Sequence, residues 1–84
     1  LDPVDWYREA DATPALATVA AALWSERQLS LRYESWQRTA RRVLSPLGLV
    51  LKAGAWYLVA AQTDQARTYR VSNILEAEVL DTRA

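Results

Sequence analysis

The fold class follows from the stretch Leu29-Ser30-Leu31-Arg32-Tyr33-Glu34, because the spacing of apolar residues along the chain changes there. Apolar and polar residues alternate strictly in this stretch, which is typical of a strand with one face buried and the other in water. In the preceding segment, apolar residues recur at the helical spacing i, i+3, i+4, i+7 and i+8, namely Leu16, Val19, Ala20, Leu23 and Trp24. The change of period near Gln28 therefore predicts one helix followed by a β domain.

The helix is predicted to span residues 14–26. Thr13 suits the position that caps free amide groups, and Pro14 suits the first helical position because its fixed φ is already helical. Arg27 follows the predicted C-terminus, where a cation is favourable. Residues 1–13 show no period, and we interpret them as a lead-in or linker to a domain that spans residues 14–84.

Five strands are predicted after the helix, over residues 28–34, 41–52, 55–61, 67–71 and 77–80. The second strand is long, and it contains Pro46 and Gly48. Because proline cannot donate to a strand ladder and glycine weakens a strand interior, we expect a bulge or sharp bend near residues 45–48. Such bends let a short sheet curl. The chain is therefore predicted to be mostly β, a small closed five-stranded barrel with the helix over one end or one open edge.

The composition excludes several kinds of site. A chain of 84 residues allows one domain, and it contains no Cys and no His. Disulfides and zinc sites built on thiolates or imidazoles are thereby excluded, and the absence of Cys fits a reducing cytoplasm. The apolar stretch over residues 15–24 is too short to cross a membrane, which needs roughly 20 residues. Ser45 has no partner base at a recognisable spacing, the two glycines form no phosphate loop, and the acids lack metal-ligand spacing. We therefore predict a protein that is not an enzyme and holds no metal or cofactor.

The formal net charge of zero hides an uneven distribution. Residues 28–74 hold seven basic and two acidic residues, a net charge of +5, whereas residues 1–27 carry −3 and residues 75–84 carry −2. A basic middle between acidic ends is compatible with a surface that attracts anions, and also with an uneven scatter of charge that has no function.

Four blocks of sequence occur in a fixed order: Leu29-Ser30-Leu31-Arg32-Tyr33, residues 41–51, Trp56-Tyr57-Leu58, and residues 67–74. This ordered set covers roughly residues 15–80 and resembles the WYL domain, the family named for the tripeptide. The resemblance implies an SH3-like or Sm-like five-stranded barrel. It also implies a sensor module of bacterial transcription regulators that is attached to a helix-turn-helix domain.

The same resemblance implies a ligand and the residues that bind it. The ligand is nucleic acid, in particular a single strand, or a nucleotide-like anionic effector held in a basic groove. The positions that match the family's basic and aromatic positions are Tyr33, Arg42, Arg67 and Arg70. Where the family often has a further arginine, this chain has Asn73, which removes one charge from the expected site.

The alternation of strand residues adds two expectations. Arg67 and Tyr69 share one face of their strand, whereas Arg70 lies on the other, so both arginines reach one ligand only at a bend or a strand end. Trp56 and Leu58 share a face and are predicted to be core residues. Two other functions stay open: a sensor of a small anionic metabolite, and an interaction or dimerisation module without its own ligand.

Overall fold

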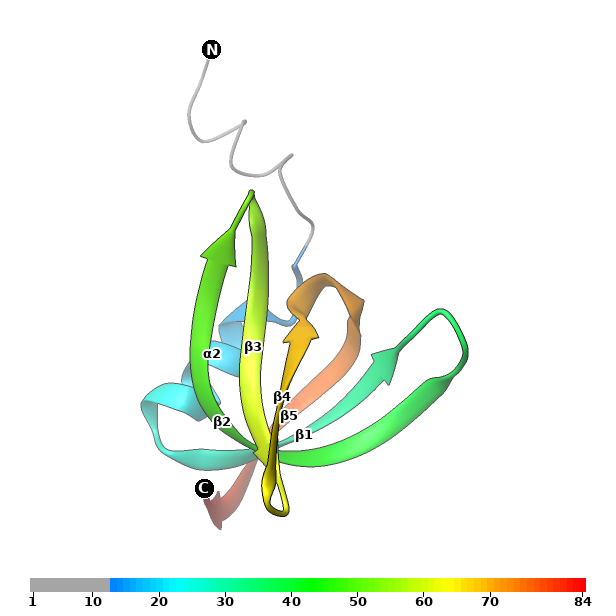
Figure 1. Ribbon diagram of the computed structural model, residues 1–84. Helices are drawn as coiled ribbons and strands as arrows, with labels where there is room; N and C mark the ends of the chain where they lie inside the picture. The colour runs from blue at the N-terminus through cyan, green and yellow to red at the C-terminus, as the bar shows by residue number, and fades with distance from the viewer. Residues whose placement is uncertain (1–12) are drawn as a thin grey trace.

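In residues 13–84, the part of the chain that the computed structural model describes, one α-helix lies against five strands (Figure 1). The elements in chain order are α2 (Leu16–Trp24), β1 (Arg27–Glu34), β2 (Thr39–Lys52), β3 (Ala55–Gln62), β4 (Gln65–Arg70), the 3-10 helix η1 (Val71–Asn73) and β5 (Ile74–Arg83). The mostly β class that the sequence predicts is confirmed. The helices described are too short to cross a membrane.

The five strands form one antiparallel sheet in the order β4-β3-β2-β1-β5. Strand β2 belongs to both halves of this sheet, because its first half pairs with β1 and its second half pairs with β3. Its register shifts between Pro46 and Gly48, so the predicted bend is confirmed. Figure 1 shows β2 curving through this region, so that the two halves of the sheet face each other across the interior.

The predicted closure of the barrel is wrong, because β4 and β5 are the two edges of the sheet and do not pair. Strand β4 has only six residues, and η1 then turns the chain so that β5 returns to the outer side of β1. We call the line along which β4 has no neighbouring strand the seam. The molecule is therefore a strongly bent open sheet with a barrel-like core.

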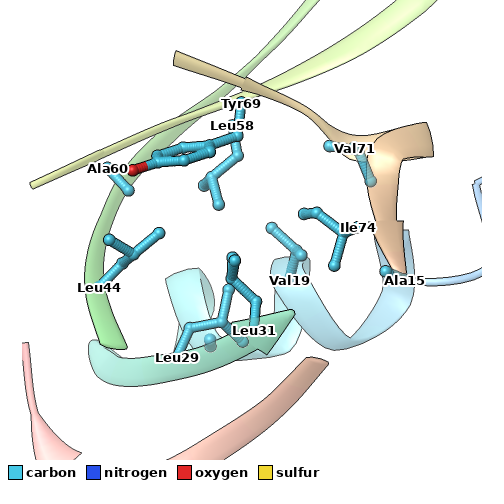
Figure 2. Packing of buried hydrophobic residues seen from close by; sticks show 11 residues of the cluster. Ala15, Val19, Leu29, Leu31, Leu44, Leu58, Ala60, Tyr69, Val71 and Ile74 are labelled. Atoms are coloured by element: carbon cyan, nitrogen blue, oxygen red, sulfur yellow. The ribbon is translucent and has the colours of Figure 1, made fainter. Parts of the chain in front are cut away.

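Side chains from α2 and from both halves of the sheet form one apolar core (Figure 2). The largest fully buried side chains are Leu29, Leu31, Leu44, Leu58, Ile74, Val19 and Val71. The prediction that Trp56 and Leu58 are core residues is supported, since Leu58 is fully buried and Trp56 is partly buried and packs against the core. Helix α2 packs against β5, β1 and β2, which covers the open side of the core next to β5.

The predicted helix was too long at both ends, and its buried face was predicted only in part: Val19 is fully buried and Leu16 packs against the core, but Trp24 does not. The N-cap is Ala15, without a side-chain hydrogen bond, so the predicted capping by Thr13 is wrong. The buried positions are Ala15, Val19 and Ala22. Because successive residues turn by about 100°, Trp24 lies about 200° around the helix from Ala22 and points away from the core. It is 92% exposed, although the sequence placed it on the apolar face.

Strand boundaries also differ from the prediction, notably at the starts of β4 and β5. Strand β4 begins at Gln65 because Thr63 and Asp64 form a two-residue turn, with φ of 58° at Thr63, which brings Gln62 opposite Gln65. Strand β5 begins at Ile74, which fills the core and pairs with Tyr33. Apart from Thr13, the lead-in predicted over residues 1–13 lies outside the described residues.

Candidate functional site

Two tyrosine rings meet across the seam. Tyr33 lies near the end of β1 and Tyr69 lies in β4, and their ring centroids are 5.0 Å apart at an interplanar angle of 85°, an edge-to-face contact. Tyr69 is 7% exposed and belongs to the core, whereas Tyr33 is half-buried at its border. Because β1 and β4 do not pair, this aromatic contact joins the two halves of the sheet where no ladder does.

The hydroxyl of Tyr33 makes a second connection across the seam. Its oxygen accepts a hydrogen bond from the backbone N–H of Arg70, at a donor–acceptor distance of 3.4 Å. This N–H lies on the edge of the sheet, where none of the five described strands offers a carbonyl. Tyr33 therefore satisfies one of the main-chain groups that the open edge of β4 exposes.

The strand register places Arg42 and Arg67 on the face of the sheet that lines the core. Arg42 lies opposite Leu31 in β1, and Arg67 lies opposite Ala60 in β3. Residues directly opposite each other in a ladder share a face, and both Leu31 and Ala60 are fully buried. The two arginines thus lie on the concave face, at the solvent-exposed border of the core.

The tyrosine pair and the two arginines are neighbours by register. Arg42 is diagonally next to Tyr33, since Leu31 is opposite Arg42 and Tyr33 is opposite Ala40. Arg67 is two residues from Tyr69 on the same strand face. Such neighbours are within reach of long side chains. We call the four residues Tyr33, Arg42, Arg67 and Tyr69 the concave rim.

Within the described part of the chain, the guanidinium groups of the concave rim donate hydrogen bonds to neutral acceptors. The Arg42 side chain donates to the carbonyl oxygen of Arg41 at 3.2 Å, and the Arg67 side chain donates to the amide oxygen of Gln65 at 3.4 Å. Among residues 13–84, no ion pair involves Arg42 or Arg67. Both groups therefore keep N–H donors from which an anion can accept hydrogen bonds.

The third predicted arginine, Arg70, is placed differently. It lies opposite Tyr57, one residue out of phase with the buried Tyr69, so its side chain is on the convex face. Its Nε donates to the Ser72 hydroxyl at 3.1 Å, and its backbone N–H donates to Tyr33. The structure therefore brings Tyr33, Arg42 and Arg67 to one face, and Arg70 meets them at the end of β4 through its main chain.

Two other arginines are engaged by a carboxylate on the outer face of the sheet. Glu76 in β5 accepts hydrogen bonds from Arg32 at 3.2 Å and from Arg41 at 3.3 Å. The hydrogen bond and the positive charge of Arg32, with a smaller contribution from Arg41, lower the pKa of Glu76 below its ordinary value. No sequence pattern indicated this partnership, because it requires the β1–β5 register, which places Glu76 opposite Arg32.

This arrangement suits recognition of a phosphate or of a base. Guanidinium groups present planar forks of donors that match phosphate oxygens, and they also stack on bases. A partly exposed tyrosine beside them offers a ring on which a base can stack. Tyr69 is buried in the core and supports the Tyr33 ring through the edge-to-face contact. No group of His, Cys, Asp and Glu side chains within residues 13–84 is arranged to hold a metal ion.

Comparison with known proteins identifies the family. The family described as the WYL domain matches residues 14–79 of this chain. The solved structure of proteasome accessory factor B/C (PafBC) of Arthrobacter aurescens is similar at a TM-score of 0.76 and 28% sequence identity, over 83% of this chain and 12% of that one. The chain thus corresponds to a small part of PafBC, and no curated protein matches it. Because the family match extends over most of the sequence, the chain belongs to the WYL domain family.

Proposed function

We propose that this chain is the ligand-sensing domain of a bacterial transcription regulator and that its concave rim binds single-stranded nucleic acid or a nucleotide-like anion. The observation that carries the proposal is the position of Arg42 and Arg67 on the same face as the Tyr33–Tyr69 pair. Membership of the WYL family and similarity to part of PafBC support the regulatory role.

The chemistry of the concave rim favours a ligand with both phosphate and base. Arg42 and Arg67, which have no carboxylate partner within residues 13–84, attract a phosphate backbone. No ion pair within that range has to break when the ligand binds to them. The half-buried Tyr33 ring supplies a stacking surface, which tolerates any base because every base has a π-face. The buried Tyr69 holds that ring from behind, which reduces the entropy lost on binding.

The proposal extends to the rest of the regulator. The domain acts without catalysis or cofactor in the cytoplasm, and ligand binding alters how an attached helix-turn-helix domain engages DNA. Homodimerisation of the regulator is part of the same proposal. The attached helix-turn-helix domain follows from the family resemblance, whereas the cytoplasmic location and the absence of catalysis and cofactor rest on the composition of the chain.

The experiment is a titration of the 84-residue chain with mononucleotides and with oligothymidylates of increasing length, at low and moderate salt. Each phosphate contact adds roughly 0.7 to the slope of log K against log salt for a single strand. Contacts from both Arg42 and Arg67 therefore predict a slope of about −1.4, and replacing either residue with alanine should reduce its magnitude by about 0.7.

The matched control is Arg41→Ala, because Arg41 is adjacent to Arg42 but faces the outer surface and pairs with Glu76. We expect this variant to bind like the parent chain, apart from the loss of one distant charge. Equal weakening by Arg41→Ala and Arg42→Ala would show that binding follows overall charge and not the concave rim. The variant Arg70→Ala decides whether the third arginine takes part from the end of β4.

The titration also separates the other candidate functions. Mononucleotides that bind as tightly as long oligonucleotides, with little dependence on salt, would indicate a small-molecule sensor. If neither Arg42→Ala nor Arg67→Ala affects the binding of any of these ligands, the domain is an interaction module.

A further inference from the structure

Strand β4 is an open edge of the sheet. It pairs with β3 on one side, and among the strands of residues 13–84 it has no neighbour on the other. Within residues 13–84, the main contact across the seam comes from Tyr33, at the C-terminal end of β4. An edge of this kind presents main-chain donors and acceptors to which another extended segment can pair.

The hydrogen bond from Arg70 to Tyr33 shows which main-chain groups of β4 point outward. The N–H of Arg70 is directed across the seam, away from β3. In an antiparallel ladder, N–H and C=O groups of alternate residues point to the same side. The main-chain groups of Ala66 and Thr68 therefore point outward as well, and those of Arg67 and Tyr69 point toward β3.

A hollow on the convex face of the sheet lies next to this edge. Its volume is about 460 Å³, and it is lined by Val50, Lys52, Ala53, Tyr57, Val59 and Thr68. The lining is mostly apolar, and Thr68 belongs to the edge strand itself. A side chain carried on a strand added beside β4 would thus extend over the hollow.

Glycine keeps the neighbouring part of this face free of side chains. Gly48 in β2 lies opposite Val59, and a Cβ atom built on Gly48 would meet no atom within 4 Å. The convex face therefore has room for an incoming apolar side chain, of the kind that gives strand addition its specificity.

The charges around the edge indicate the chemistry of the partner. Strand β4 contains Arg67 and Arg70 and no acidic residue, and the hollow contains Lys52 and no acidic residue. Arg67 lies on the concave face, so a carboxylate on that side of an added strand meets a cation.

We propose that β4 and the convex hollow form a strand-addition site for an extended protein segment in which apolar and acidic residues alternate. The main chain of the segment pairs with Ala66 and Thr68, its apolar side chains cover the hollow, and its carboxylates lie beside Arg67. A second copy of this chain is a poor occupant when paired through its own β4, because four arginines would then meet with no carboxylate on either strand.

The test uses the 84-residue chain and a blocked peptide of alternating valine and glutamate, about six residues long to match a strand. The readout is NMR: chemical shifts and hydrogen exchange of individual backbone amides. We expect the peptide to slow exchange at Ala66 and Thr68. A peptide with lysine in place of glutamate should bind about tenfold more weakly or worse, because it places like charges beside Arg67.

Two changes test main-chain pairing directly. A valine–glutamate peptide N-methylated at alternate residues cannot complete the ladder, and it leaves the protein unchanged. The variant Thr68→Pro removes an outward N–H without removing a bond to β3, as proline is tolerated on strand edges, and thermal unfolding checks its fold. Each change should weaken binding about tenfold, as expected for the loss of hydrogen bonds.

The proposal is overturned if the glutamate peptide leaves exchange at Ala66 and Thr68 unchanged, or if the lysine or N-methylated peptide binds equally well. It stands or falls separately from nucleic-acid binding. The variant Arg42→Ala should weaken oligonucleotide binding on the concave rim and leave peptide binding at β4 unchanged.

Discussion

Replacing Tyr33 with phenylalanine removes one oxygen from the seam and leaves the aromatic ring in place. In the parent chain that oxygen accepts a hydrogen bond from the backbone N–H of Arg70, at a donor–acceptor distance of 3.4 Å. The ring packs edge-to-face on Tyr69, with the ring centroids 5.0 Å apart. The variant therefore separates the two contacts that connect β1 to β4. Tyr33→Ala removes both of them.

The structure gives a different magnitude for each variant. An average hydrogen bond contributes about 0.5–1.5 kcal/mol, and a long bond at an exposed strand edge belongs at the lower end, so Tyr33→Phe should cost about 0.5 kcal/mol. Removing the ring also forfeits the edge-to-face contact and the burial of about half a ring, so Tyr33→Ala should cost about 2–3 kcal/mol. At 4–8 °C per kcal/mol, the melting temperature should fall by about 2–4 °C and by at least about 8 °C, respectively.

Two assays apply to both variants. Urea denaturation followed by tryptophan fluorescence gives the free energy of unfolding. Hydrogen exchange reports the Arg70 amide itself, which should exchange faster in Tyr33→Phe while buried ladder amides of β3 are unchanged. The matched control is Tyr57→Phe, because Tyr57 lies on the convex face and its hydroxyl has no hydrogen bond among the described residues.

Two results would refute this reasoning. If Tyr33→Phe were as destabilising as Tyr33→Ala, the ring contact would contribute nothing and the hydroxyl would hold the seam alone. If exchange of the Arg70 amide were the same in the parent chain and in Tyr33→Phe, the hydrogen bond across the seam would not persist in solution.

Three further predictions concern stability. Leu58→Ala deletes a fully buried side chain and should cost about 2–5 kcal/mol by chemical denaturation, whereas a cost below about 1 kcal/mol would contradict its place in the core. Ion pairing keeps the folded-state pKa of Glu76 below its ordinary value of 4.5, so its contribution is present above pH 4.5 and is lost as the pH falls through the lowered value. Melting temperatures measured against pH should therefore fall less steeply in Glu76→Gln than in the parent chain. Ala53 has a φ of 52° in the β2–β3 turn, so Ala53→Asn should raise the unfolding free energy by about 0.5–1 kcal/mol, since asparagine tolerates this conformation.

The sequence predicted most of the fold because its signals were local. Strict alternation in residues 29–34 specified a half-buried strand, and Pro46 with Gly48 specified the bend in β2. Closure of the barrel was predicted wrongly because it depends on whether β4 and β5 meet. The chain reverses direction through η1 between them, and no pattern within either strand records that geometry.

The helix shows a second limit of pattern reading. Trp24 was placed on the apolar face because apolar residues in this alanine-rich segment fit more than one helical stripe. The stripe that is buried consists of Ala15, Val19 and Ala22, whose side chains allow the helix to lie close to the sheet. A prediction from hydrophobicity placed the largest apolar residues on the buried face. In the folded protein the smaller residues are buried there, because they allow close packing of the helix against the sheet.

The sequence predicted which residue types form the candidate site, but not which of these residues lie close together. Alternation alone separated Arg67 from Arg70, and the structure agrees with that separation. The proximity of Arg42 to Tyr33 requires the β1–β2 register, and the proximity of Tyr33 to Tyr69 requires the bend of the whole sheet. Contacts between residues so distant in sequence leave no local signal.

The distribution of carboxylates explains how a chain of zero net charge can present a positive site. Glu76 forms ion pairs with Arg32 and Arg41 on the outer face of the sheet. No carboxylate in residues 13–84 forms an ion pair with Arg42 or Arg67. Exposed charges farther apart than the Debye length, about 8 Å at physiological salt, hardly influence each other. A ligand at the concave rim therefore meets the charge of its nearest groups and not the total charge of the chain. Adding salt should weaken its binding accordingly, even though the protein as a whole is formally neutral.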